Sequence, residues 1–295
     1  MTAWEEGFLL LSSNLGSADR KPLTVSQLRT LAMRIRAAKP PQADRELEAA
    51  DIIALGYAPE MACRIVGLLE DKELLKYYLR KGNQAGCAPI TRVSENYPVL
   101  LRKNLGLDSP GVLWAKGDLS LLSKPKVALV GSRDIDQPNA AFAKKTGQEA
   151  ARQGYVLISG NARGADSLAQ RACLEAGGQV ISVVADELEK RQVYPNLLYL
   201  SEEGFDLPFT SVRALSRNRV IHALGCKTFV AQSGMGVGGT WSGVSRNLRM
   251  GWSPVFCFRD GREAAVQLEQ LGAVLIGLSD LENFDRLEQN SPSFF

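Results

Sequence analysis

Two arginine residues follow glycine-rich turns, and their setting predicts that this chain binds an anion. The first turn is Gly131-Ser132-Arg133, directly after an apolar run at 127–130. The second, after another apolar run, contains Ser159, Gly160, Arg163 and Gly164. Where a strand turns into a helix, free backbone N–H groups and the helix dipole attract anions, and a guanidinium group can hold phosphate through two hydrogen bonds. Two such turns in consecutive strand–helix units predict a phosphate at the carboxyl edge of a parallel sheet.

A second set of basic residues lies in a stretch, residues 207–258, that contains no Asp or Glu. Arg217, Asn218 and Arg219 stand there just before a predicted apolar helical segment at 220–224. Residues i and i+2 point the same way in an extended chain, whereas in a helix they do not. We therefore expect at least one of the two arginines to face a ligand while the other pairs within the protein. The stretch predicts a locally positive surface; burial of strands and glycine loops is the alternative reason for its lack of acids.

A glycine loop in the same stretch is the third candidate. Gly236, Gly238, Gly239 and Thr240 follow a predicted strand and open a predicted helix, with Trp241 next in the chain. Such a loop offers many N–H groups to a phosphate, although it lacks the Lys and Ser/Thr of a P-loop. For Trp241 two interpretations stay open: stacking on a nucleobase and packing on the sheet.

Catalytic, metal and cofactor sites are not predicted. The single histidine, His222, lies in an apolar run, so we expect a buried residue or part of a pocket wall, with no spacing that suggests a catalytic triad. Asp166 is expected to start a helix or pair with an arginine. The five cysteines are far apart and form no C-x-x-C pair, which argues against zinc and against a disulfide framework.

The elements that must position these residues predict an α/β fold. Apolar runs at 127–130, 156–159, 180–184, 228–231, 254–258 and 273–276 predict strands, with helical patterns between them and a further strand at 112–117. Continuous apolar strands alternating with helices indicate a Rossmann-like, doubly wound, mostly parallel sheet. Residues 1–85 are expected to form a small helical domain of the SAM or helix-hairpin-helix kind, residues 86–285 the core, and residues 286–295 a flexible tail.

Composition restricts the class further. Apolar residues make up 45% and charged residues 23%, and the formal net charge is +3, which are values of ordinary globular proteins. We expect no membrane helix, because no apolar run reaches about 18 residues. The acidic start of the chain does not resemble a signal peptide, so the sequence predicts a cytoplasmic protein.

Five motifs in order resemble the DNA-processing protein A family (DprA, also called Smf). They are Tyr97-Pro98 with Leu101, followed by Pro110, Val112-Leu113-Trp114 and Gly117; the run 127–133; Ser159-Gly160, Ala162-Arg163-Gly164 and Asp166; Tyr194-Pro195-Asn196; and Ser216-Arg217-Asn218-Arg219-Val220-Ile221. The resemblance implies a Rossmann-like core that binds single-stranded DNA in a basic pocket, forms a homodimer and helps to load RecA, without catalysis. By position, Arg133, Arg163, Arg217 and Arg219 would be the phosphate and pocket residues.

Departures from the family pattern leave two alternatives open. Gln170 stands where the family usually has His, Ala231-Gln232 replaces Glu-Ala, and no C-terminal winged helix follows. This is typical of a divergent branch, some of it associated with phage defence or toxin–antitoxin loci, so an accessory role with a protein partner such as a cognate toxin is one alternative. A nucleotide sensor or phosphoribohydrolase-like enzyme is the other, because residues 236–240 resemble part of P-G-G-x-G-T-x-x-E, although no acid follows until Asp260.

Overall fold

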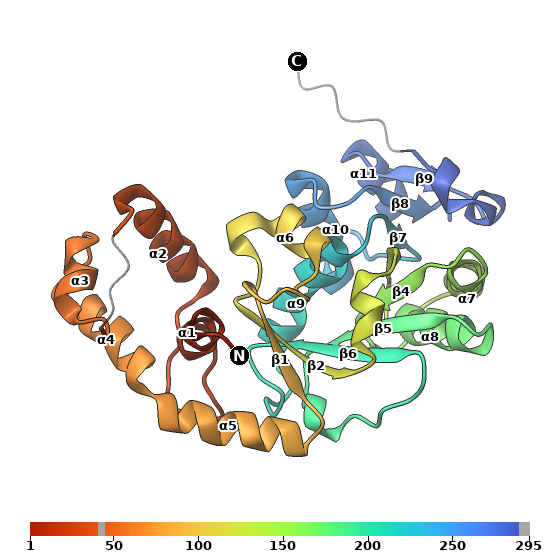
Figure 1. Cartoon of the computed structure of the whole chain (residues 1–295). Helices are drawn as coiled ribbons and strands as arrows, with labels where there is room; N and C mark the ends of the chain where they lie inside the picture. The colour runs from red at the N-terminus through yellow and green to blue at the C-terminus, as the bar shows by residue number, and fades with distance from the viewer. Residues whose placement is uncertain (41–44, 289–295) are drawn as a thin grey trace.

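The computed structural model describes residues 1–40 and 45–288. Its helices, shown in Figure 1, are α1 (Ala3–Ser12), α2 (Val25–Ala38), α3 (Ala49–Ala54), α4 (Pro59–Glu70), α5 (Lys72–Gln84), α6 (Val99–Leu105), α7 (Gln137–Arg152), α8 (Ala165–Glu175), α9 (Ser211–Leu224), α10 (Gly238–Met250) and α11 (Glu263–Gln270). Its strands are β1 (Ala88–Thr91), β2 (Val112–Gly117), β3 (Lys126–Val130), β4 (Val156–Ser159), β5 (Gln179–Val184), β6 (Leu197–Glu202), β7 (Thr228–Val230), β8 (Val255–Phe258) and β9 (Val274–Ile276). Each strand expected from an apolar run is confirmed, with ends that shift by at most a residue.

The strands of the described residues form one sheet in the order β1-β2-β6-β5-β4-β3-β7-β8-β9. The run from β6 to β9 is parallel, and β1 and β2 add an antiparallel edge. From β3 the chain builds outward in one direction through β4, β5 and β6 and then returns to place β7 on the other side of β3. Ligands in such sheets bind where the strand order reverses, beyond the carboxyl ends of the strands. That point lies between β3 and β7.

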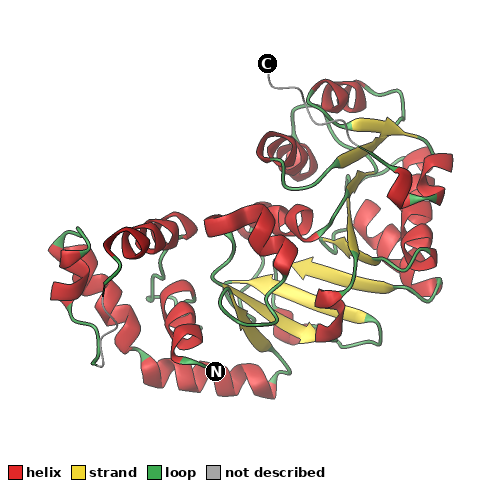
Figure 2. Cartoon of the chain, turned by 45° about the horizontal axis from the view of Figure 1, so that its top comes forward, coloured by secondary structure: helices red, strands yellow, loops and turns green. Residues whose placement is uncertain are grey.

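Alternate residues of each strand face two separate cores, which explains the continuous apolar runs. Val127 and Leu129 pack in one core with α7 and α8, whereas Ala128 and Val130 pack in the other with α9 and α10. Figure 2 shows helices on both sides of the twisted sheet. The expected doubly wound α/β fold is therefore confirmed.

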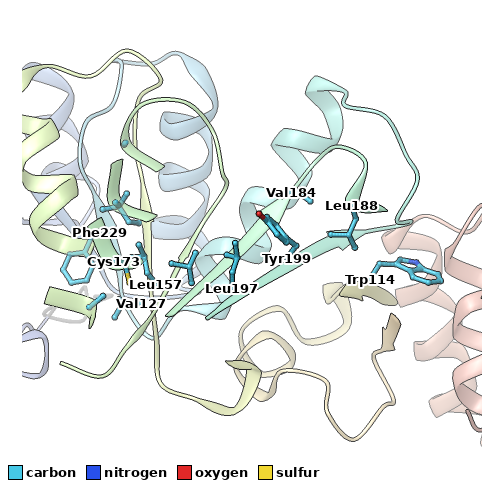
Figure 3. Packing of buried hydrophobic residues seen from close by; sticks show 14 of the residues in the cluster. Trp114, Val127, Leu157, Cys173, Val184, Leu188, Leu197, Tyr199 and Phe229 are labelled. Carbon is cyan, nitrogen blue, oxygen red and sulfur yellow. The ribbon is translucent and has the colours of Figure 1, made fainter. Parts of the chain in front are cut away.

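The N-terminal helices pack in two different cores. Helices α2, α3 and α4 stand apart from the sheet in Figure 1 and share a small core of their own that includes Leu28, Ile52 and Ile65. Helices α1 and α5 instead contribute Leu9, Leu75 and other residues to the first core of the sheet domain. Figure 3 follows that core from Phe229 as far as Trp114, which lies beside the N-terminal helices.

Several elements differ from the sequence-based prediction. Strands β1 and β6 were not expected; β6 lies between β2 and β5, and its one signal is the apolar run at 197–200. Helix α9 begins at Ser211, because the Thr210 hydroxyl accepts a hydrogen bond from the Arg213 N–H (3.1 Å) and caps it. Arg217, Asn218 and Arg219 therefore lie inside a helix and not before one. Most of the predicted tail, residues 289–295, lies outside the described residues.

Candidate functional site

A cleft of about 750 Å³ opens at the switch point, above the carboxyl ends of β3 and β7. One side comes from the turns after β3 and β4, and the other from α9 and the start of α10. Of the predicted site residues, the cleft is lined by Gly131, Ser132, Arg133, Arg217, Asn218, Gly238, Gly239 and Thr240. Three distant segments of the sequence thus meet at the one place where the topology predicts a ligand.

The turn after β3 packs directly on the start of α8. A side chain at Gly131 would collide with the Ala165 methyl group, and a side chain at Gly164 would collide with the Ser132 and Arg133 carbonyl groups. Gly164 also has a φ of +85°, a conformation that favours glycine. The Ala165 N–H donates to the Ser132 carbonyl (3.1 Å). The two turns therefore meet as expected. Their glycines, however, make room for neighbouring protein groups and not for a ligand.

Ser132 joins the loops on either side of the switch point. Its N–H (3.0 Å) and its hydroxyl (3.3 Å) both donate to the Gln232 carbonyl. These donors, which the sequence suggested for phosphate, are therefore engaged within the protein. Arg133 is exposed, and its guanidinium forms no hydrogen bond or ion pair with the described residues. It is the group of this turn that is free for a ligand.

Asp166 closes the turn after β4. Its Oδ2 accepts hydrogen bonds from the N–H groups of Gly160 (3.0 Å) and Ala162 (3.2 Å). Burial raises the pKa of this carboxyl group, whereas the charge of Arg217 and the two N–H donors act in the opposite direction. The Asp166 carboxyl group thus has a structural role at the start of α8, in agreement with the role expected from the sequence.

Arg217 is a buried cation at the junction of these turns. It is 9% exposed, and its Nη2 donates to the Gly160 carbonyl (2.8 Å). A Cβ atom at Gly160 would overlap the guanidinium, so glycine makes room for it. The Arg217 Nε has no hydrogen-bond partner among the described residues. Burial lowers the pKa of Arg217, and Asp166 opposes the shift. A buried guanidinium with an unsatisfied donor is stabilised by an anion.

Four arginines surround a smaller pocket of about 250 Å³ next to the cleft, called here the arginine pocket. They are Arg133, Arg163, Arg191 and Arg217, and the Gly160 backbone lies among them. Arg163 forms an exposed ion pair with Asp134 (2.6 Å), and Arg191 pairs with Asp186. The pocket and the cleft share Arg133, Ala162, Phe209 and Arg217 among their lining residues, so they form one continuous site.

Arg219 points away from this site. It is buried, forms an ion pair with Glu202 and donates to the Asp108 carbonyl (2.5 Å). Residues i and i+2 of a helix are rotated by about 200°, so Arg217 and Arg219 face different neighbours. One arginine meets the cleft and the other pairs internally, as the sequence alternatives allowed. Asn218 between them lines the cleft, and its Nδ2 donates to the Gly239 carbonyl (3.1 Å).

Four other predicted residues lie outside the lining of both spaces. Ser159 is fully buried, and its hydroxyl accepts from the Gln170 side chain (2.5 Å). Gly164 is a packing position, and Gly236 has a φ of +68° in the exposed loop before α10. Trp241 is partly buried against the second core, so of its two interpretations the structure favours packing.

The two glutamines that depart from the family pattern both have structural partners. Gln170 Nε2 donates to the hydroxyl groups of Ser159 (2.5 Å) and Ser182 (3.0 Å), which ties α8 to β4 and β5. Gln232 Oε1 accepts from the Asp136 N–H (3.0 Å) at the start of α7. Both therefore stabilise the floor of the site.

Two site residues were missed by sequence reasoning. Arg191 lies in the segment between β5 and β6, which carries no glycine turn. Phe209 precedes α9, is 53% exposed and lines both the cleft and the arginine pocket. An exposed aromatic ring beside a basic pocket offers a flat surface for a nucleobase. Phe209 lies near Arg133 and Arg217 because the β6–α9 loop returns over the sheet. The sequence carries no signal for the path of this loop.

The site has few acids, and each is engaged within the protein. Its acids are Asp134 and Asp186, each paired with an arginine, and Asp166, which is held by backbone N–H groups. Within residues 1–40 and 45–288, no group of three or more His, Cys, Asp or Glu side chains could hold a metal ion. In the same residues no helix is long and apolar enough to span a bilayer. The arrangement can hold phosphates and a stacked ring.

Known proteins resemble this chain both in sequence and in structure. The profile of the family described as DNA recombination-mediator protein A matches residues 88–276. DNA processing protein DprA of Streptococcus pneumoniae is 32% identical over 185 residues, which cover 59% of this chain and 60% of that protein. DprA of Bacillus subtilis is 34% identical over 113 residues, 38% of this chain and 37% of that protein. The matched segments thus span less than two thirds of these relatives.

Solved structures support the same relationship. The X-ray structure of DNA processing protein A from Streptococcus pneumoniae covers 98% of this chain and 99% of its own, with a TM-score of 0.73 and 26% identity. A structure of DNA processing protein A from Helicobacter pylori, which concerns the single-stranded DNA binding mode of that protein, covers 67% of this chain and 93% of its own, with a TM-score of 0.54 and 24% identity. The second likeness shows a shared fold.

Proposed function

Because its sequence matches the family profile over well more than half of its length, this chain belongs to the DNA recombination-mediator protein A family, and we propose that it binds single-stranded DNA in the cleft and the arginine pocket without catalysing a reaction. The observation that carries the proposal is Arg217, a buried cation with an unpartnered Nε at the point where cleft and pocket meet. A phosphate there would offset the charge of the guanidinium group, which lines both spaces.

Single strands fit the site better than duplex because of Phe209. A base can stack on this exposed ring only when it is not paired and stacked inside a double helix. Phe209 and the arginines line the same space, so one nucleotide could place its phosphate against the guanidinium groups and its base against the ring. Such contacts tolerate any sequence, since every base has a flat face.

The non-enzymatic part of the proposal rests on the lack of a free acid at the glycine loop. Trp241, Ser242 and Gly243 follow Thr240, where a phosphoribohydrolase would need its carboxylate. The buried carboxyl group that lines the cleft, Asp166, already accepts two backbone N–H groups. We therefore favour binding over hydrolysis.

Family membership alone supports the finer part of the proposal, a cytoplasmic homodimer that helps to load RecA. The alternative of a protein partner such as a toxin rests in part on Gln170 and Gln232. Since both side chains have structural hydrogen bonds, these departures no longer indicate that the ligand site has been lost.

Fluorescence anisotropy of a labelled oligo-dT, measured at several salt concentrations, tests the proposal. We expect wild-type binding to weaken steeply with salt, and Arg133→Ala/Arg163→Ala to reduce the log–log salt slope by about 1.4, because each phosphate contact to a single strand contributes about 0.7. The matched control is Arg171→Ala, an exposed α8 arginine that lines neither space. Absence of wild-type binding even at low salt would overturn the proposal.

A further inference from the structure

The far side of the cleft, at the start of α10, presents donors without acceptors. Helix α10 has 13 residues, and its N-cap is Val237, whose side chain cannot accept a hydrogen bond. The first N–H groups of a helix have no partner within the helix. For those of Gly238, Gly239 and Thr240, no acceptor lies among the described residues. Gly238, Gly239 and Thr240 all line the cleft.

A buried histidine points a further donor to the same place. His222 is 1% exposed yet lines the cleft, and a Cβ atom at Gly243 in α10 would lie 3.0 Å from its Nε2. Each hydrogen bond of the ring in the structure is made by the other nitrogen, Nδ1. In the described part of the chain, Nε2 therefore has no partner.

The network behind the ring determines which nitrogen carries the proton. The Ser253 N–H donates to Asn247 Oδ1 (3.0 Å), which fixes the orientation of that amide. The Asn247 Nδ2 group then donates to Ser253 Oγ (3.1 Å) and to His222 Nδ1 (3.4 Å). Thr228 Oγ1 contacts both Ser253 Oγ (2.8 Å) and Nδ1 (3.3 Å), consistent with a chain of donors that ends on Nδ1. Nδ1 thus accepts, and the proton is on Nε2, which faces the cleft.

We propose that His222 Nε2–H, the Thr240 hydroxyl and the free N–H groups at the start of α10 form a second phosphate subsite, separate from the arginine pocket. It rests on the proposed function, because the ligand is a phosphoryl group of the bound nucleotide chain or of a free nucleotide. Several convergent donors at the positive end of a helix match the oxygens of one phosphate. Burial lowers the pKa of His222 to about 3, so the ring acts as a neutral donor.

The wild-type protein allows a direct test, because His222 is its only histidine. Long-range proton–nitrogen NMR of the imidazole should show the Nε2–H tautomer. Saturating oligo-dT should shift the Nε2 signal more than the Nδ1 signal. An Nδ1–H tautomer, or an unchanged Nε2 signal when anisotropy shows that the oligonucleotide is bound, would overturn the subsite while leaving the proposed function intact. Absence of any oligonucleotide binding would instead contradict the proposed function.

The source of the phosphate is distinguished by three probes: 5′-phosphorylated oligo-dT, the same strand with a 5′-hydroxyl, and thymidine monophosphate. A larger Nε2 shift with the phosphorylated strand indicates a terminal phosphate, and equal shifts indicate an internal one. A shift with the mononucleotide indicates that the subsite alone suffices.

A variant separates this neutral subsite from the cationic pocket. Thr240→Val removes a hydroxyl and keeps the branched shape, so we expect affinity to fall about tenfold with the salt slope unchanged, since no cation is lost. Arg133→Ala should lower the slope as well as the affinity. Unaltered affinity in Thr240→Val, together with an Nε2 signal that does not respond, would refute the proposal.

Discussion

Arg217 combines a structural position with the ligand-binding role that we propose for it. Its guanidinium fills the space that glycine leaves at position 160, and Asp166 offsets its charge from the same turn. A cation in this setting is held in place before the ligand arrives, so little side-chain entropy is lost on binding. In the proposed function, an exposed arginine such as Arg133 would attract the ligand at longer range, whereas Arg217 would hold it at a fixed position.

Gly160→Ala tests this dependence without touching an arginine. The added methyl group overlaps the Arg217 guanidinium, so we expect the side chain to be displaced and the affinity for oligo-dT to fall at least tenfold. Anisotropy measures the affinity. Gly67→Ala is the control, because a methyl group there meets nothing within 4 Å, and it should leave binding unchanged. Equal affinities for both variants would contradict a role for the Arg217 position.

Phe209→Ala should weaken oligo-dT binding by about 1–3 kcal/mol, the usual contribution of a base stacked on an aromatic ring. The salt slope should stay as in the wild type, because no charge is removed. Anisotropy at several salt concentrations measures both. Trp4→Ala, at an exposed aromatic of α1, should bind normally, and a Phe209→Ala protein that also binds normally would exclude stacking there.

His222 should make stability depend on pH. Its pKa falls from an ordinary value of 6.5 to about 3 on burial, so between these values the unfolded chain binds the proton and the folded chain does not. The free energy of unfolding should therefore decrease as pH is lowered through this window, by up to about 1.4 kcal/mol per pH unit, and be insensitive to this group above about pH 7. Urea unfolding of the wild type and His222→Gln measures the difference, which should shrink at lower pH; a constant difference would contradict the shift.

At the scale of elements, the site depends on how loops are joined across the sheet. Ser132 binds the Gln232 carbonyl across the switch point, and Gln232 in turn accepts from the start of α7. The turns after β3 and β4 meet because β3 and β4 are adjacent strands. The turns after β3 and β4 are thus short loops held at both ends by regular elements, whereas Arg217 of the candidate site is carried by α9 itself.

Gln170→Leu should destabilise the protein by about 1–3 kcal/mol. It leaves the buried hydroxyl groups of Ser159 and Ser182 without their donor. Urea denaturation gives the change, and Arg171→Leu, the exposed neighbour on α8, provides the control. A negligible change at position 170 would show that these hydroxyls find other partners.

At the scale of the whole molecule, the helical segment and the sheet domain share a core. Tyr78 of α5 contacts the rings of Trp114 (5.2 Å between centroids) and Phe205 (4.5 Å), and its hydroxyl donates to Asp206 (2.6 Å). Although helices α2 to α4 have a core of their own, α5 packs in the core of the sheet domain. We therefore propose that the two predicted domains, 1–85 and 86–285, unfold as one unit through α5.

Tyr78→Ala tests that proposal, with an expected loss of about 3–5 kcal/mol in the free energy of unfolding. Urea unfolding followed by tryptophan fluorescence and by far-UV circular dichroism should give one transition for the wild type and the variant. Tyr77→Ala, 60% exposed on the same helix, should change little. Two separate transitions in the wild type would show that the domains are independent.

Residue patterns are enough to predict the strand–helix alternation, the meeting of the two arginine turns and the sheet edge at which the candidate site lies. These follow from local patterns, since an apolar run predicts a buried strand and parallel strands end at one edge. That Arg217 and Arg219 face different neighbours was also expected from the sequence. It follows once both residues are known to lie in a helix.

Which groups remain free for a ligand depends instead on how distant segments pack together. Ser132 and Gly164 belong to matching motifs, yet one donates to Gln232 and the other packs on the preceding turn. Phe209 and Arg191 carry no motif and still line the site. Whether a donor is engaged depends on partners distant in sequence, brought close by packing of the sheet, and no local pattern records those distances.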